Sequence, residues 1–245
     1  MIAAGDLHQA WRALPVAPLS DIIGGGTCLI LAPHPDDESL GCGGLIAACC
    51  AAGRPPLVAI LTDGAGSHPQ SHAFPPARLR ALREREARDA VAYLGLPPDR
   101  ILFLGQPDTA APHQGPAFTV AVNALSACVK RENHCSAILA PWRHDPHCDH
   151  EAASLIAAAV AERCEIRAVG FPVWGWTLPD DHAVPAPESS GWRLDIARFL
   201  PLKRQAIQAH RSQYGGLITD DPTGFQLPPA LLSAFETSFE TFLQS

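Results

Sequence analysis

The sequence predicts an α/β fold: a single domain with a mostly parallel sheet and helices on both faces, in a Rossmann-like arrangement. Two observations lead to this fold class. Apolar segments of strand length alternate with longer segments of helical periodicity, and glycine or proline separates most of them. The length of 245 residues also fits one large domain, which buries enough surface to need no disulfide bonds.

A β-α-β unit is expected at the start of the domain. Residues 1–26 form a mixed leader that ends in three glycines, and residues 27–32 are a short apolar run that predicts a buried strand. Residues 45–52 are rich in alanine and cysteine and precede Gly53, which predicts a helix packed on the sheet. Residues 57–61 predict a second strand, joined to the first by a right-handed crossover.

The same alternation continues along the chain. Residues 77–94 place arginine and glutamate between alanine and leucine at helical spacing, and Gly95 stops this helix. The later segments predict strands at 101–104, 137–140, 166–173 and 192–196, helices at 118–130, 152–161 and 202–213, and a proline-rich loop at 178–190. Residues 214–245 are expected to form a C-terminal extension with a helix. With no internal repeat and no linker, residues 1–245 are expected to be one domain.

Composition excludes several classes of protein. The net charge is −7, and lysine and arginine form no long run, so the electrostatic signature of a nucleic-acid binder is missing. No window approaches the roughly 18 apolar residues of a membrane span, and the N-terminus does not resemble a signal peptide. Eight scattered cysteines without a CxxC pair favour reduced thiols and a cytoplasmic location. The oligomeric state stays open, a homo-oligomer included.

Chemically capable residues follow the predicted strands. The segments are PHPDDE after the first strand, TDG after the second, GQPD after the third and PWRHDPHCDH after the fourth. Ligands gather at the carboxyl ends of the strands in open parallel sheets, so these segments are expected to meet at one site.

A metal site is the chemistry that these residues favour. His34 and Asp37 lie three residues apart after the first strand, and His147 and His150 repeat the spacing before a later helix. Imidazole and carboxylate ligands match a three-ligand catalytic zinc site, which keeps its fourth position for water. The ligand types do not separate zinc from iron(II), cobalt or manganese.

Two motifs resemble a known family. The segment 32–38, APHPDDE, is close to the AHPDDE signature of the LmbE-like (PIG-L-type) N-deacetylases. His147 to His150, HCDH, is similar to that family's HPDH, with Cys148 in the proline position. Weaker agreement covers roughly residues 27–213. The resemblance implies a zinc-dependent enzyme that removes an N-acetyl or other N-acyl group from an amino-sugar-containing small molecule or glycoconjugate.

The same resemblance implies a role for each motif residue. His34, Asp37 and His150 match the zinc ligands, and Asp36 matches the general base that takes a proton from water. His147 matches the residue that stabilises the oxyanion as a positively charged donor. Asp149 is expected to hold His147 in its tautomer and to raise its pKa. An aspartate in the position of Asp36 is otherwise typical of a helix N-cap.

The resemblance also implies three substrate-binding residues: Arg83, Asp108 and His210. Each has a plainer alternative. Arg83 fits an exposed, salt-bridged helix, Asp108 fits a turn after a proline, and His210 fits a partly solvated helix.

Four other residues stay open. His144 fits a solvated loop or an extra ligand, and Cys148 fits a thiolate ligand or a spacer. Trp174 and Trp176 fit sugar stacking or core packing equally well. Residues 177–191, which lie where specificity is expected, carry no recognisable signature.

Two other functions remain at this point. One is a sugar- or nucleotide-binding module without catalysis, and the other is a metal-dependent hydrolase of a different bond. The intact Asp36, His147 and Asp149 argue against the first, since a binding module needs no general base. A two-metal phosphatase would require more carboxylate ligands than these motifs supply.

Overall fold

The computed structural model describes residues 1–132, 134–185 and 190–244, and its centre is a seven-stranded sheet with the order β4-β3-β2-β5-β6-β9-β8. The strands are β2 (Thr27–Ala32), β3 (Leu57–Thr62), β4 (Ile101–Gln106), β5 (Cys135–Pro141), β6 (Arg167–Phe171), β8 (Gly191–Asp195) and β9 (Phe239–Gln244). Strands β4, β3, β2, β5 and β6 are parallel, whereas β9 runs antiparallel to both of its neighbours. The predicted α/β class with a mostly parallel sheet is confirmed.

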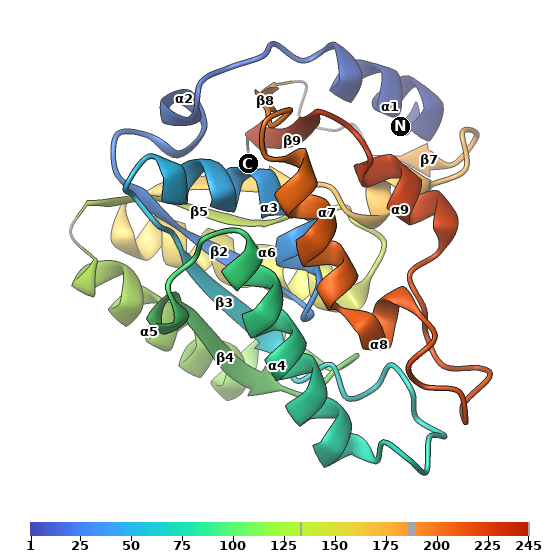
Figure 1. Ribbon diagram of the computed structural model, residues 1–245. Helices are drawn as coiled ribbons and strands as arrows, with labels where there is room; N and C mark the ends of the chain where they lie inside the picture. The colour runs from blue at the N-terminus through green and yellow to red at the C-terminus, as the bar shows by residue number, and fades with distance from the viewer. Residues whose placement is uncertain (133, 186–189, 245) are drawn as a thin grey trace.

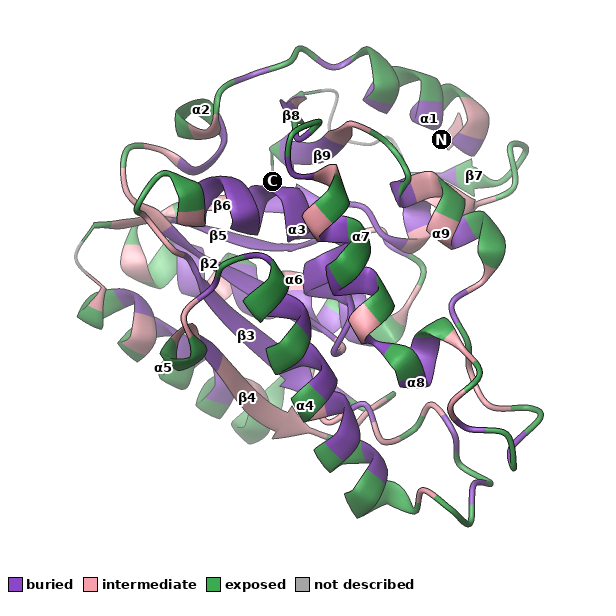
Figure 2. Cartoon of the chain, viewed as in Figure 1, coloured by how far each residue is buried: buried purple, intermediate pink, exposed green. Residues whose placement is uncertain are grey.

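Helices cover both faces of the sheet (Figure 1). One face carries α3 (Asp37–Ala51), α4 (Pro76–Tyr93) and α7 (Leu200–Ala209), and the other carries α5 (Gly115–Arg131) and α6 (Cys148–Cys164). Strand β2 shows why both layers are needed, because Ile30 packs into the first core and Leu29 and Leu31 pack into the second. A strand buried on both faces is apolar along its length, as residues 28–32 of β2 are. Figure 2 shows β3 buried along its length and β4, at the edge, only half-buried.

Helix α3 lies very close to the sheet. A Cβ added at Gly41 would stand 2.3 Å from the Phe171 ring, and one added at Gly44 would stand 2.4 Å from Ile196. Small residues at these two positions therefore permit the close approach. The helix begins at Asp37, well before the predicted residue 45, so the second half of PHPDDE forms its first turn.

The predicted leader is more structured than expected. It contains β1 (Ile2–Ala3), α1 (Ala4–Ala13) and α2 (Leu19–Ile23), and β1 pairs with β7 (Ala183–Val184). Trp11 of α1 packs edge-to-face on Trp142 and Trp176, with ring centroids 5.0 Å and 4.9 Å apart. These partners are distant in the sequence, which is why local periodicity did not reveal the element.

The C-terminal region also differs from the prediction. The expected helix at 202–213 is two helices, α7 and the short α8 (Arg211–Tyr214), separated at His210. The extension supplies the expected helix as α9 (Pro229–Phe235) and also β9, which enters the sheet between β6 and β8. Strand β9 contains a buried carboxylate, Glu240, which accepts hydrogen bonds from the backbone N–H groups of Gly44 and Leu45 and pairs with Lys203 Nζ at 2.7 Å.

Two short 3-10 turns complete the fold, η1 (Pro98–Arg100) and η2 (Trp174–Thr177). Residues 186–189 of the predicted proline-rich loop lie outside the described part of the chain. No helix among the described residues is long and apolar enough to cross a bilayer.

The strand order places the functional site. The chain passes from β2 to β3 and β4 on one side, then returns to β5 and β6 on the other side of β2. Such a switch point opens a crevice at the carboxyl ends of the two central strands, here β2 and β5. The PHPDDE and PWRHDPHCDH segments leave the sheet at these two ends.

Candidate active site

A cavity of about 420 Å³ opens at the carboxyl ends of β2 and β5. Its lining includes several of the predicted site residues: His34, Asp36, Asp37, Arg83, Asp108 and His147. His150 is fully buried behind them. The fold therefore brings together residues of four segments, of which the first and the last are more than a hundred positions apart.

Asp37 joins the two histidines of the predicted ligand set. Its Oδ2 atom lies 3.1 Å from His34 Nδ1 and 3.3 Å from His150 Nε2. The His34 backbone N–H donates to the same oxygen at 3.0 Å, which fixes the carboxylate in the turn. A tetrahedral ion with bonds of about 2.0–2.1 Å separates its ligand atoms by roughly 3.3 Å, so each of these two contacts has the spacing of a pair of ligands on one metal ion.

The histidine partners also fit metal ligation. Among the described residues, neither ring nitrogen of the fully buried His150 has a hydrogen-bond partner, and its Nδ1 faces Asp145 Oδ2 at 3.4 Å. His34 Nε2 lies 3.0 Å from Asp149 Oδ2. Each imidazole therefore presents one nitrogen to Asp37 and the other to a second carboxylate, the usual arrangement around a metal-binding histidine.

The electrostatics of the cluster favour a cation. Although burial alone lowers it, the pKa of His34 is raised well above its usual value by hydrogen bonds to Asp108, Asp149 and Asp37. The pKa of His150 likewise rises to about 9 against burial, because Asp37 and Asp145 face it. Protons on the two rings balance the surrounding carboxylates in the metal-free chain, and a divalent ion would supply the same positive charge.

A three-histidine set competes with the predicted ligands. His34, His147 and His150 each place a nitrogen within 4.8 Å of the others. Two further sets in the described part of the chain meet the same limit, His147 with Cys148 and Asp149, and His34 with Asp108 and Asp149. The predicted set of His34, Asp37 and His150 is not among these three sets, although Asp37 contacts both histidines.

Asp36 stands in an unusual backbone conformation. Its φ of 151° and ψ of −29° lie in a region that disfavours residues with a Cβ. Its backbone N–H donates to Glu38 Oε2 at 2.9 Å, and its Oδ2 accepts from Arg83 Nη2 at 3.2 Å. Asp36 does occupy the N-cap position of α3, but its carboxylate makes no capping hydrogen bond. Burial raises the pKa of Asp36 to about 7, although the guanidinium of Arg83 opposes this.

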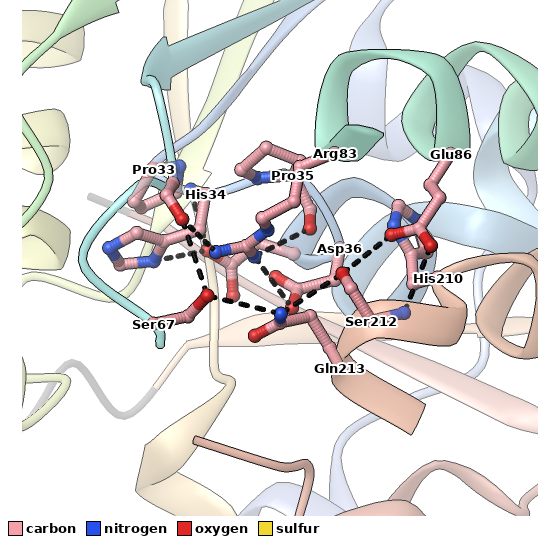
Figure 3. Close-up of polar contacts among 12 residues, drawn as sticks. Pro33, His34, Pro35, Asp36, Ser67, Arg83, Glu86, His210, Ser212 and Gln213 are labelled. Carbon is pink, nitrogen blue, oxygen red and sulfur yellow. Dashed lines mark hydrogen bonds and ion pairs between the residues drawn. The ribbon is translucent and has the colours of Figure 1, made fainter. Parts of the chain in front are cut away.

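Arg83 is buried, and the exposed-helix alternative is wrong. Its side chain is 3% exposed, and its guanidinium donates to the Gly64 carbonyl and the Pro35 carbonyl, both at 2.9 Å, as well as to Asp36. Figure 3 shows this guanidinium beside Asp36 and the Pro35 carbonyl. Arg83 therefore holds the loop that carries Asp36, and it also lines the cavity.

His210 lies behind the site, where it does not line the cavity. Its Nε2 contacts Glu38 Oε1 at 2.9 Å in the interior, and Glu38 in turn accepts from the Asp36 N–H. The structure does not support the expectation that His210 contacts the substrate, because its side chain is buried outside the cavity lining. Beside it, Glu86 accepts from the backbone N–H and the hydroxyl of Ser212, at 2.9 Å and 2.6 Å (Figure 3).

Asp149 does not orient His147 as expected. Its carboxylate accepts from the backbone N–H groups of Thr109 and Ala111 and contacts His34. These hydrogen bonds overcome burial and lower the pKa of Asp149 to about 2. The loop after β4 therefore turns this carboxylate toward His34, and Asp149 becomes the partner of a predicted metal ligand.

His147 also departs from the expected positive charge. Burial and the neighbouring His34 and His150 lower its pKa. Its Nδ1 accepts from the Asp149 backbone N–H at 3.1 Å, so the neutral ring carries its proton on Nε2. The hydrogen-bond donor at the cavity wall is therefore the Nε2–H group of a neutral His147 ring rather than of a charged one.

Asp108 lines the cavity, and its role in substrate binding stays a prediction. Its Oδ2 accepts from the Gly66 N–H at 2.9 Å, and its Oδ1 lies 3.4 Å from His34 Nε2. Gln213 and Ser67 line the cavity as well and are joined by a hydrogen bond of 3.2 Å.

Asp145 is a site residue that the sequence analysis did not single out. It accepts from the backbone N–H groups of Val173 and Gly175 while it faces His150. Its position two residues before His147 in the fourth strand-end segment was the available signal.

The structure gives different surroundings to the four residues whose roles the sequence left undecided. Trp174 lines the cavity, whereas Trp176 packs against Trp11 and His8 in the N-terminal cluster. His144 contacts Trp142 and Arg143 outside the cavity lining. Cys148 is exposed in the first turn of α6, with its Sγ 3.7 Å from the Thr109 carbonyl.

The fold and this cluster define the class: an α/β protein whose parallel sheet carries a cluster of histidine and aspartate at its switch point. The model of the PIG-L family, described as GlcNAc-PI de-N-acetylase, matches residues 29–161. This match covers more than half of the sequence, and the chain belongs to that family. The resemblance drawn from the two motifs is confirmed.

Known proteins show how far the likeness extends. The chain is 27% identical over 197 residues to the probable N-acetyl-alpha-D-glucosaminyl L-malate deacetylase 2 of Bacillus anthracis, covering 78% of this chain and 83% of that protein. It resembles N,N'-diacetylchitobiose deacetylase from Pyrococcus horikoshii with a TM-score of 0.62, 22% identity, and coverage of 85% of this chain and 77% of that one.

A third likeness limits what the fold alone says. The 4-carboxy-2-hydroxymuconate hydratase GalB from Pseudomonas putida has a TM-score of 0.58 and 21% identity, with coverage of 75% of this chain and 78% of that one. Its described activity is hydration, so function has to be argued from the site.

Proposed function

We propose that this chain is a metal-dependent N-deacetylase that removes the acetyl or another acyl group from an amino-sugar-containing small molecule or glycoconjugate. The observation that carries the proposal is Asp37 Oδ2, which contacts both His34 and His150 beside a second carboxylate, Asp36, in one cavity. Membership of the PIG-L family and the deacetylase relative support the choice of bond.

His34, Asp37 and His150 would hold the ion, with zinc as the first choice for two imidazoles and one carboxylate. A divalent ion there would supply Lewis-acid chemistry, because it polarises a carbonyl and makes water more acidic. Asp149 and Asp145 keep the rings of His34 and His150 in place through their second nitrogens.

The remaining steps belong to Asp36, His147 and Arg83. Asp36 accepts a proton from the attacking water and passes it to the leaving amine, since its carboxylate lines the cavity beside the proposed ligand Asp37. Arg83 fixes its orientation through Nη2. The neutral His147 donates a hydrogen bond from Nε2 to the amide oxygen as negative charge builds there.

Substrate hydroxyl groups would meet Asp108 and Gln213, which line the same cavity. We also propose a cytoplasmic location, which fits the eight free cysteines, since reduced thiols persist in a reducing compartment.

The test is a panel of N-acetylated amino sugars and glycoconjugates, assayed for acetate release before chelation, after chelation and after zinc is restored. Release that disappears with chelation and returns with zinc is the expected result. A protein that binds the sugars without releasing acetate would be the non-catalytic module instead. Release of phosphate from sugar phosphates without acetate release would assign it to another bond.

A further inference from the structure

Two chemically different groups of side chains line the cavity, and they are called here its polar half and its apolar half. Its polar half contains the proposed catalytic and hydroxyl-binding side chains. Its other half is apolar and is lined by Leu40, Val173, Trp174, Phe225, Leu227 and Leu231.

The apolar half comes almost entirely from outside the segment that matches the family model. Leu40 lies in α3 next to the metal cluster, but the other five residues follow residue 161. They belong to the end of β6 with η2, to the loop after α8, and to α9. The proposed catalytic side chains thus lie within the segment that matches the family model, and most of the apolar lining lies after it.

Backbone hydrogen bonds fix the apolar half against the polar half. The Phe225 N–H donates to the Ser67 carbonyl at 2.7 Å, and the Leu227 N–H donates to the Gln213 carbonyl at 2.8 Å. Ser67 and Gln213 are themselves cavity residues. A wall held in this way is preorganised for its ligand, because little ordering is left to occur on binding.

The same loop is anchored at a second point. Asp220 accepts from the Ala73 N–H and from the Ser71 hydroxyl, both at 2.8 Å, and Asp221 accepts from the Gln70 N–H at 2.9 Å. Gly224 lies so close to His68 that an added Cβ would stand 2.1 Å from its ring. The loop that carries Phe225 is therefore packed against the loop after β3.

Two aromatic side chains form the accessible part of this wall. Trp174 and Phe225 are half-buried, with ring centroids 5.8 Å apart and planes at 64°, whereas Leu227 and Leu231 behind them are buried. The side chains of Phe225, Leu227 and Leu231 offer no hydrogen-bonding group. A sugar hydroxyl turned toward them would lose its water without replacement, which is unfavourable.

We propose that the substrate carries an apolar alkyl or aryl group close to the scissile amide, and that this group binds the wall formed by Trp174, Phe225, Leu227 and Leu231. The inference rests on the proposed function and adds the substrate class to it. An apolar group can be attached in two ways, as a longer acyl chain on the nitrogen or as an aglycone on the sugar. Either attachment places an apolar group beside the metal cluster.

Two matched substrate pairs separate these sources. Methyl and hexyl glycosides of N-acetylglucosamine vary the aglycone, and N-acetyl- and N-hexanoylglucosamine vary the acyl chain. Burial of each methylene is worth about fourfold in kcat/KM. We therefore expect the longer member of one pair to be hydrolysed with a kcat/KM at least tenfold higher than that of the shorter member.

Phe225→Ala then tests the wall directly. The ratio of long to short substrate should fall toward one in this variant and should persist in Phe225→Leu, which keeps an apolar side chain. Phe118→Ala is the matched control, since Phe118 is also a half-buried phenylalanine but lies in α5 on the opposite face of the sheet. Thermal melting of each variant identifies any that fails to fold. If Phe225→Ala does not fold, long and short substrates are compared in Phe225→Leu instead.

Three results would overturn the proposal: equal rates within both substrate pairs, a ratio that Phe225→Ala leaves unchanged, or an equal loss for long and short substrates, which would make the ring a sugar-stacking platform. Failure of the proposed function gives a different pattern, with no hydrolysis of any member. In that case calorimetry tests the apolar wall independently of catalysis. We expect hexyl glucosaminide to bind at least tenfold more tightly than methyl glucosaminide.

Discussion

Two adjacent aspartates in the turn after β2 have different surroundings. Asp37 contacts the two histidines, and Asp36 contacts Arg83 and Glu38. We expect Asp37→Asn to lose both the metal and the activity. We expect Asp36→Asn to keep a full equivalent of metal while kcat falls about a hundredfold or more, the usual scale for a lost general base. Metal content measured beside turnover checks both, and a metal-free Asp36→Asn protein would reverse the assignment.

The two candidate ligand sets differ in His147 and Asp37. If His34, Asp37 and His150 hold the ion, His150→Ala should lose it and His147→Ala should retain it with unchanged affinity. His147→Ala should instead lower kcat by about a hundredfold, because it removes a hydrogen-bond donor to the amide oxygen. Metal titration of both variants is the measurement. A comparable loss of affinity in His147→Ala would favour the three-histidine set.

The sequence predicted where these residues lie in the fold, but it predicted less well which residues they contact. His34 and Asp37 follow an apolar strand, so their place at the carboxyl end was derivable from the pattern alone. The partner of Asp149 was not, because it depends on the loop after β4, where Thr109 adopts a positive φ of 65° and aims its N–H at the carboxylate. Such a contact arises only when three segments meet in space.

The break between α7 and α8 places His210 against Glu38, which holds the Asp36 N–H. Because this N–H belongs to a strained residue, we expect loss of the contact to let Asp36 move. His210→Ala should lower kcat about tenfold or more while the KM and the metal content change little. His182→Ala, which replaces an exposed histidine, is the control. An unchanged kcat would show that His210 is only a packing residue.

Elements built from distant partners were the ones that the sequence did not predict. Strand β9 carries Glu240 into the interior, where a polar residue argues against a buried strand unless its partners are known. Those partners lie in α3 and α7. Helix α1 is similar, because the rings that cover Trp11 come from after β5 and from η2. Local periodicity was sufficient for the β-α-β core and insufficient for these two elements.

For the molecule as a whole, neighbouring ion pairs in α7 allow a direct comparison of buried and exposed charges. The Lys203–Glu240 pair is almost fully buried, whereas Arg204 and Glu236 are each 47% exposed. Lys203→Met should lower the free energy of unfolding by about 3–5 kcal/mol, because it leaves a buried carboxylate unpaired. Arg204→Met should cost about 0–1 kcal/mol. Denaturant unfolding of both variants is the measurement, and equal values would show that the buried pair does not tie β9 to the core.

The position of β9 has a consequence for how the protein is made. Strand β8 pairs with β9, and β9 also pairs with β6, so this side of the sheet can close only after residues 239–244 have left the ribosome. Until then the edges of β6 and β8 that β9 pairs with are open, and such edges invite pairing with other chains. The parallel strands β2 to β6 can assemble earlier, while the long-range closure comes late and is expected to be slow. Nascent chains halted before residue 239 should therefore be the form of this protein most prone to aggregation and most dependent on chaperones.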